Sequence, residues 1–143
     1  MKTEEAKKLY TAIATVRGGR QGHLRTSDGI LDMDLKVPLE MGGQGGKGTN
    51  PEQLFAGGYA ACFESALRHI AGTRKMPIKD ASITAHVTLD LNGRDNYGLS
   101  VELHGKIEGL SRTDAMELMN AAHEMCPYSK ATRGNIEVKL FAD

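Results

Sequence analysis

The fold of this 143-residue chain depends on one stretch, Asn50-Pro51-Glu52-Gln53-Leu54-Phe55-Ala56-Gly57-Gly58-Tyr59-Ala60-Ala61-Cys62-Phe63. Asn50 suits a helix N-cap, Pro51 suits the first helical position, and Glu52 compensates the positive end of the helix dipole, so a helix begins here. Residues 54–63 include no charged side chain, and apolar side chains occur on every side of the predicted helix. This pattern is typical of a helix that is covered all round, so we expect a long buried central helix.

Residues on both sides of this helix are predicted to form β-strands. Alternating apolar residues or β-branched composition predict strands at residues 9–16, 23–26, 30–37, 83–91, 99–103 and 136–141. Ser111 with Asp114 three residues later predicts a capped second helix. That helix ends near Cys126, because Pro127 restricts the residue before it. Antiparallel hairpins with two separate helices indicate an α+β fold, and we expect residues 1–143 to form a single domain.

The central helix has more apolar surface than a small sheet can cover. A sheet packs against one side of a helix, whereas residues 54–63 are apolar on all sides. A second copy of the chain would cover the remaining side, since most soluble oligomers are symmetric assemblies of one chain. We therefore expect an antiparallel sheet wrapped around a long central helix in an intertwined homodimer.

Charge and hydropathy exclude several classes of partner. The 18 Lys and Arg residues balance the 18 Asp and Glu residues, so no net field attracts nucleic acid or an anionic membrane. Residues 1–8 contain no apolar segment typical of a signal peptide, and no run approaches the roughly 18 apolar residues of a membrane span. We expect a cytoplasmic protein without nucleic-acid or membrane partners.

The chain contains two cysteines, and a cytoplasmic location disfavours a permanent disulfide between them. Cys62 lies in the apolar part of the central helix, where a free cysteine behaves as a small buried hydrophobe. Cys126 lies at a helix end beside Pro127, where its side chain can reach a neighbouring element. Two cysteines on two helices form a reversible disulfide if their Cα atoms come within about 7 Å. The residues alone leave an inert pair and a redox-active pair both open.

Other polar residues carry weaker signals. The five histidines fall in no metal-ligand spacing, and neither Cys-x-x-Cys nor His-x-x-x-His occurs, so no metal site is expected. Arg20 flanks a Gly-Gly turn, where arginines are usually solvated. Glu52 at the helix start is explained by the helix dipole alone. The histidines are His23, His69, His86, His104 and His123.

Motifs around both cysteines, together with two glycine-rich segments, match one known family. The matching segments are Thr49-Asn50-Pro51-Glu52-Gln53-Leu54-Phe55-Ala56, Gly58-Tyr59, Ala61-Cys62-Phe63, Cys126-Pro127-Tyr128-Ser129, Ala131-Thr132-Arg133-Gly134-Asn135-Ile136, Gly18-Gly19-Arg20 and Gly42-Gly43-Gln44-Gly45-Gly46. On these motifs the chain resembles the organic hydroperoxide resistance proteins, a branch of the superfamily named after osmotically inducible protein C. The resemblance runs nearly end to end.

The resemblance implies a thiol-dependent peroxidase that reduces organic hydroperoxides to alcohols and protects against oxidative stress. It makes Cys62 the peroxidatic cysteine and Cys126 the resolving cysteine, which are joined by a disulfide during turnover. Arg20 with Glu52 would activate the thiol and position the peroxide. A buried thiol has a raised pKa, so the mechanism needs a fixed cation, which an arginine supplies and a glutamate can hold. In the family, dihydrolipoyl groups of lipoylated proteins, or dihydrolipoamide, reopen the disulfide, and no cofactor is implied.

An apolar pocket formed by Phe55, Tyr59 and Phe63 is expected to favour a lipid-like or aromatic hydroperoxide over hydrogen peroxide. Two other interpretations use the same residues. One is a non-catalytic redox sensor, which reacts once and changes shape, and the other is a small-molecule binding domain in which Cys62 is only a core residue. An enzyme differs from both, because it consumes many equivalents of hydroperoxide when a dithiol is present.

Overall fold

The computed structural model describes residues 5–143. Residues 1–4, the first half of the segment 1–8 in which no signal peptide is predicted, lie outside the described residues. The chain divides into two compact units, one ending at Pro51 and the other spanning Glu52–Asp143. Each unit has its own three-stranded sheet. The single domain over residues 1–143 stays a prediction.

The first unit contains a small antiparallel sheet. Its elements are β1 (Ala14–Arg17), η1 (Gly19–Gln21), β2 (His23–Thr26), β3 (Asp32–Asp34) and η2 (Leu39–Met41), with the strand order β1-β2-β3. All three strands predicted before the central helix are present, but residues 9–13, 30–31 and 35–37 lie outside them. β2 has four residues, and it pairs with four residues of β1 and three of β3. β1 and β3 are shorter than predicted, because β2, the strand between them, has only four residues with which they can pair.

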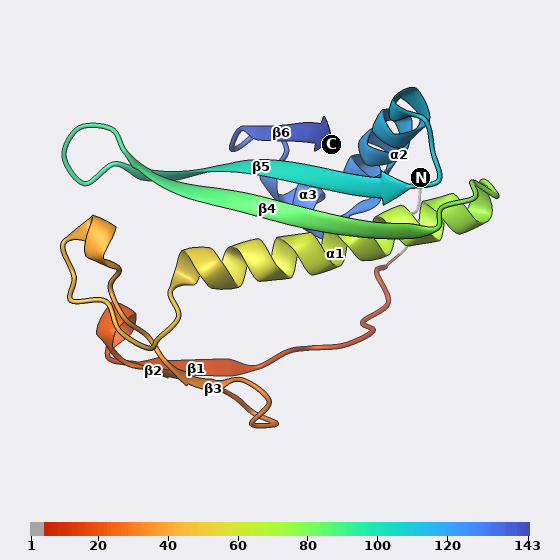
Figure 1. The fold of residues 1–143 in the computed structure, drawn as a ribbon. Helices are drawn as coiled ribbons and strands as arrows, with labels where there is room; N and C mark the ends of the chain where they lie inside the picture. The colour runs from red at the N-terminus through yellow and green to blue at the C-terminus, as the bar shows by residue number, and fades with distance from the viewer. Residues whose placement is uncertain (1–4) are drawn as a thin grey trace. The chain divides into compact units, whose positions relative to one another are not determined.

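The second unit combines a long helix with a second sheet and two further helices. Its elements are α1 (Pro51–Thr73), β4 (Asp80–Leu91), β5 (Tyr97–Glu108), α2 (Arg112–Met125), α3 (Pro127–Thr132) and β6 (Val138–Ala142). β4 and β5 form the long predicted hairpin, and α1 runs along it (Figure 1). The predicted cap of α2 is confirmed, because the Ser111 side chain accepts a hydrogen bond from the Asp114 N–H.

The prediction of a fully antiparallel sheet is wrong at its last strand. β6 pairs with β5 in parallel, from Val101↔Val138 to Gly105↔Ala142. Both α2 and α3 lie between these two strands in the sequence, and a connection of this length returns the chain to the starting end of its neighbour. The sheet order β4-β5-β6 is therefore mixed, with one antiparallel and one parallel pair.

The core lies between the sheet and the helices. Val101, Leu103 and Ile107 of β5 are buried together with side chains of α1 and α2. Each fully buried aliphatic side chain of this size contributes about 1.5–3 kcal/mol. Gly105 permits a close approach of α2, because a Cβ atom at this position would lie 2.4 Å from the Met119 sulfur. Gly105 therefore lets α2 pack closely against β5.

The predicted central helix is present and is unbroken over 23 residues. Tyr59 and Phe63 are buried, whereas Gly57 and Ala61 are exposed. The apolar stretch at residues 54–63 is therefore only partly covered within one chain. Burial on all sides and the intertwined homodimer stay predictions. Among residues 5–143, no helix has the length and apolar character needed to cross a membrane.

Candidate active site

Cys62 and Cys126 lie next to each other in the second unit. Cys62 is on α1 and is partly exposed, whereas Cys126 lies between α2 and α3 and is fully buried. Both are free thiols, and Cys126 lies near enough to Cys62 to raise the pKa of the Cys62 thiol. The backbone N–H of Tyr128 also lies near the Cys62 sulfur and lowers the pKa of this thiol. The structure thus brings together the two cysteines that the sequence singled out.

The surroundings of Cys62 hold its pKa above the ordinary thiol range. Burial is the largest cause, because a thiolate loses solvation there. The Tyr128 N–H lowers the pKa by stabilising the thiolate, while the hydrogen bond and charge of Cys126 raise it. With these contacts Cys62 is a protonated thiol at neutral pH. Nucleophilic chemistry at Cys62 therefore needs a further group that stabilises the thiolate.

The backbone at Cys126 explains the position of its side chain. α2 ends there because Pro127 follows, and Cys126 has φ and ψ of −61° and 125°, outside the helical region. Its N–H donates to the Ala122 carbonyl and its carbonyl accepts from the Lys130 N–H, so it ends α2 and begins α3. α3 was not predicted, although Pro127 occupies the first helical position, which prolines favour.

A network of side-chain hydrogen bonds connects residues near both cysteines. Tyr59 Oη lies 2.8 Å from Ser129 Oγ and 3.1 Å from Thr132 Oγ1. Ser129 Oγ lies 2.7 Å from His123 Nδ1, and Thr132 Oγ1 donates to the Ser129 carbonyl at 3.1 Å. Tyr59, Ser129 and Thr132 are buried. Partial burial, reinforced by the charge of Arg133, lowers the pKa of His123, so its ring is neutral at neutral pH.

Three aromatic rings contact one another where α1 meets α3. The Tyr59 ring centroid lies 5.9 Å from that of Phe55 and 5.6 Å from that of Tyr128. Gly58 leaves room for this cluster, because a Cβ atom there would lie 2.6 Å from the Tyr128 hydroxyl oxygen. An apolar cavity of about 490 Å³ opens beside Phe55 and Tyr128. Its other lining residues are Leu99, Pro127, Ala131, Thr132, Asn135 and Ile136.

A second cavity, of about 360 Å³, reaches Cys62 itself. It is lined by Cys62, Ser65, Ala66, His69, Met125 and Pro127. Pro127 lines both cavities, so the two cavities adjoin at this residue. Small molecules can therefore approach Cys62, whereas Cys126 is fully buried.

The remaining predicted site residues occupy different places. Phe55 lines the first cavity, and Tyr59 packs behind it. Phe63 is fully buried in the core, and the linings of the two cavities do not include it. Arg20 belongs to η1 in the first unit, and Glu52 lies in the first turn of α1 in the second. Their pairing and their action on the thiol stay predictions.

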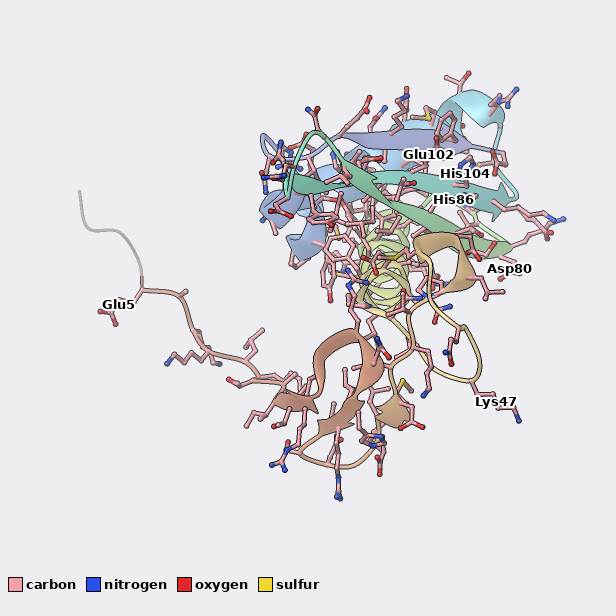
Figure 2. The ribbon with its side chains drawn as sticks, turned by 90° about the vertical axis from the view of Figure 1, so that its left-hand side faces the viewer. Glu5, Lys47, Asp80, His86, Glu102 and His104 are labelled. Carbon is pink, nitrogen blue, oxygen red and sulfur yellow. The ribbon has the colours of Figure 1, made fainter. Side chains whose placement is uncertain are left out.

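A histidine cluster lies away from the cysteines, on β4 and β5, where Figure 2 labels His86, Glu102 and His104. His104 Nε2 lies 3.0 Å from Glu102 Oε1, and its Nδ1 lies 3.2 Å from Asp143 Oδ2. These carboxylates, Glu102 first, raise the pKa of His104. Within residues 5–143, no group of three or more His, Cys, Asp or Glu side chains has the geometry of a metal site.

Comparison with known proteins gives a family for this geometry. Residues 42–141, which include both cysteines and the aromatic cluster, match the model of the OsmC-like proteins. The chain belongs to the OsmC family.

Members of the OsmC family resemble the chain over nearly its full length. The organic hydroperoxide resistance protein OhrB of Bacillus subtilis (strain 168) is 50% identical over 133 residues, which cover 92% of this chain and 96% of that protein. The organic hydroperoxide resistance protein of Xanthomonas axonopodis pv. citri (strain 306) is 47% identical over 136 residues, 94% of each chain. A crystal structure of an organic hydroperoxide resistance protein from Legionella pneumophila matches with a TM-score of 0.91 and 52% identity, over 96% of this chain and 99% of that one. The predicted family resemblance and the α+β fold are confirmed.

Three residues that the sequence analysis did not assign are central to the site of this OsmC-family chain. Tyr128 and Ser129 follow Cys126 in a matched motif, but nothing in the motif says that one binds Cys62 and the other Tyr59. His123 lies three residues before Cys126 on α2, a spacing that places the two on the same side of a helix. That spacing was the one available signal for His123.

Proposed function

We propose that this chain is a thiol-dependent peroxidase that reduces organic hydroperoxides to alcohols and protects against oxidative stress. The proximity of Cys62 and Cys126 carries the proposal, because two free thiols from different elements lie near enough for Cys126 to raise the pKa of Cys62. The names of its relatives from Bacillus subtilis and Xanthomonas axonopodis support the substrate class, since both are called organic hydroperoxide resistance proteins.

The first step is attack by Cys62. Its thiolate forms a bond to the distal oxygen of the hydroperoxide, and the O–O bond breaks. The alkoxide leaves and takes up a proton to become the alcohol. Cys62 is oxidised to a sulfenic acid, and the hydroperoxide is reduced by two electrons.

The second step is resolution by Cys126. Its sulfur attacks the sulfur of the Cys62 sulfenic acid, so that the S–S bond forms and the S–O bond breaks. The hydroxide that leaves takes the Cys126 proton and becomes water. A dithiol then reduces the disulfide by exchange and is itself oxidised to a cyclic disulfide. We assign this part to the dihydrolipoyl group of a lipoylated protein, for which dihydrolipoamide is the free equivalent.

Activation of Cys62 is assigned to Arg20 and Glu52. Burial holds the pKa of Cys62 high, and the single N–H from Tyr128 opposes this only in part. A guanidinium never deprotonates in the relevant range, so an arginine at the thiol would stabilise the thiolate at neutral pH. A carboxylate can hold that guanidinium in a bidentate pair.

The substrate class follows from the apolar cavity beside Phe55 and Tyr128. Burying on the order of 100 Å² of a substrate's apolar surface stabilises its complex by about 2.5 kcal/mol, or about 50- to 100-fold in affinity. Hydrogen peroxide has no apolar surface to bury. We assign Tyr59 and Phe63 the role of packing behind this surface.

The proposed homodimer is supported by apolar side chains that the chain leaves exposed. In the first unit, Leu9, Tyr10 and Ile30 have exposed fractions of 86%, 81% and 80%. Gly57 and Ala61 of α1 are also exposed, within the stretch that is apolar on every side. A second copy of the chain would bury these surfaces and complete the cover of α1.

A peroxidase assay tests the proposal. We expect many turnovers with cumene hydroperoxide and dihydrolipoamide, and much slower consumption of hydrogen peroxide or with a monothiol reductant. Cys62→Ser should abolish reduction, because a hydroxyl is a far weaker nucleophile at neutral pH. Cys126→Ser should reduce one equivalent and then accumulate oxidised Cys62. One equivalent consumed by the wild-type chain would identify a sensor instead, and an unreactive Cys62 would identify a binding domain.

A further inference from the structure

The two cysteines are flanked by polar side chains at matching distances. Tyr59 lies three residues before Cys62, and His123 and Ser129 lie three residues before and after Cys126. The hydrogen bond between His123 and Ser129 spans the junction of α2 and α3 at which Cys126 lies. The bond from Ser129 to Tyr59 then joins this junction to α1. The same three side chains thus connect the two helices that carry the thiols.

The donor and the acceptor of each hydrogen bond in this network can be assigned, because each hydroxyl has only one hydrogen to donate. The Thr132 hydroxyl donates to the Ser129 carbonyl, so its oxygen accepts from the Tyr59 hydroxyl. Because Tyr59 has spent its one hydrogen, it accepts from the Ser129 hydroxyl. Ser129 in turn must accept from His123, whose Nδ1 therefore carries a hydrogen. Every hydrogen in the chain has one acceptor, and the direction runs from His123 to Thr132.

A fully satisfied buried network of this kind specifies one geometry. Tyr59 and Ser129 are fully buried and Thr132 is 5% exposed, so water cannot replace a lost partner there. Among the described buried side chains, no polar atom lacks a hydrogen-bond partner. Displacing Ser129 relative to Tyr59 would break two bonds at once. The junction is therefore held against α1 independently of any bond between the thiols.

We propose that the hydrogen-bond chain from His123 through Ser129 to Tyr59 positions Cys126 for its attack on the oxidised Cys62. Cys126 sits between two helices, where Pro127 contributes no N–H and α3 is only six residues long. Disulfide formation requires the two Cα atoms within about 7 Å and a specific dihedral, so a loose junction would lower the effective concentration of one thiol at the other. His123, Ser129 and Tyr59 are positioning residues in this scheme, because they act through Cys126.

The catalytic meaning of this inference rests on the proposed peroxidase function, but its geometric content can be measured without a hydroperoxide. In the full-length chain, the Cys62–Cys126 disulfide exchanges with dithiothreitol, so that the protein disulfide is reduced while dithiothreitol is oxidised to its cyclic disulfide. We expect Ser129→Ala to lower the equilibrium constant for the protein disulfide about tenfold. Ser82→Ala, the same change at an exposed position of β4, should leave it unchanged.

A second readout uses the competition that follows peroxide attack. Slower resolution leaves the sulfenic acid exposed to a second hydroperoxide, which converts it to the sulfinic acid. We expect Ser129→Ala to raise the yield of sulfinic Cys62 per turnover about tenfold by mass spectrometry. The rate of the first attack should stay within twofold of wild type by stopped flow, because Ser129 does not contact Cys62 in the scheme.

Two further pairs separate positioning from general stability. His123→Asn can keep an N–H near the Nδ1 position and should restore most of the effect, whereas His123→Leu should behave like Ser129→Ala. His123 is only partly buried, so its variants remain informative if Ser129→Ala fails to fold. Gly105→Ala would crowd Met119, whose side chain takes no part in the hydrogen-bond network, so it should lower the melting temperature without changing either readout.

The outcomes distinguish the two proposals. A wild-type equilibrium constant and sulfinic yield in Ser129→Ala and His123→Leu would overturn the positioning role, whatever the melting temperatures. Equal changes in Gly105→Ala would overturn it as well, by showing that any loss of stability suffices. A wild-type chain that consumes no organic hydroperoxide would refute the peroxidase, while the dithiothreitol equilibrium would still decide the role of the network.

Discussion

Gly58→Ala is a sharp test of how α1 and α3 are fitted together at the site. The new Cβ atom would lie 2.6 Å from Tyr128 Oη, 3.2 Å from Cζ and 3.3 Å from Cε2. The phenol ring must therefore move by about 1 Å to reach an ordinary contact distance. Tyr128 is 38% exposed and can move outward, so we take the lower part of the overpacking range, about 1–2 kcal/mol.

Helix propensity acts in the opposite direction, which makes the neighbouring glycine a matched control. Replacing a mid-helix glycine by alanine stabilises a helix by about 0.5–1 kcal/mol. At Gly57 a Cβ atom meets nothing within 4 Å, so Gly57→Ala should show this gain alone. Gly58→Ala should be less stable than Gly57→Ala by about 1–2 kcal/mol, or about 2–8 °C in melting temperature.

The same substitution has a chemical readout. The Tyr128 backbone N–H lowers the pKa of the Cys62 thiol, so a shift of the Tyr128 backbone together with its ring should raise that pKa further. Thermal unfolding of the reduced proteins and the pH dependence of Cys62 alkylation measure the two effects. Equal gains in stability from both alanines, with the same Cys62 pKa, would refute the close fit. A destabilising Gly57→Ala would instead indicate that a second subunit packs over that face.

Three further predictions concern other groups. Arg20→Ala should raise the pKa of Cys62 and slow peroxide attack with little change in melting temperature, and an unchanged pKa and rate would return Arg20 to the solvated turn. If each site takes Cys62 from one subunit and Arg20 from the other, mixing a Cys62→Ser chain with an Arg20→Ala chain should restore roughly one active site per heterodimer. If native mass spectrometry shows the heterodimer and no activity returns, each site lies within one chain. The pKa of His104 is raised by its pairing with Glu102 and Asp143, so this pairing stabilises the fold fully below the histidine pKa of the unfolded chain and less as the pH rises through the pKa of the folded chain. The pKa of Glu102 is lowered, so its contribution to stability is lost in acid, as the pH falls through the Glu102 pKa of the folded chain. His104→Asn should therefore lose most stability near pH 5–6 and least near pH 9 in urea unfolding, and a loss that does not vary with pH would exclude the charged pair.

Local signals in the sequence predicted the elements that local chemistry controls. Pro51 and Glu52 mark the start of α1, and Ser111 with Asp114 marks the cap of α2, because each signal acts within one helical turn. The alternation after residue 83 predicted the long hairpin for the same reason. The strand direction of β6 could not be predicted this way, since it depends on how α2 and α3 return the chain to β5.

The candidate site was predictable as far as its cysteines and not as far as their surroundings. The periodicity of α1 places aromatic residues one turn apart, but it does not say which of them faces a cavity. Phe55 lines the larger cavity, whereas Phe63 is buried in the core. Tyr128, from the helix α3 that was not predicted, lines this cavity where Phe63 was expected. The contact between Tyr59 and Ser129 joins residues 70 positions apart, and no local pattern encodes such a pair.

The junction at Cys126 also limits which changes of sequence this site can tolerate. One residue there ends α2, begins α3 and carries a thiol, so these three properties cannot be altered separately. Moving the thiol to position 125 would turn it about 100° around the axis of α2 and take it out of the core, because Met125 is exposed whereas Cys126 is fully buried. Inserting or deleting one residue between His123 and Ser129 would shift the thiol and the hydrogen-bonded side chains out of register together. Homologous variation here is therefore expected as substitution at fixed length, and chimeras should exchange the segment from His123 to Thr132 as one piece.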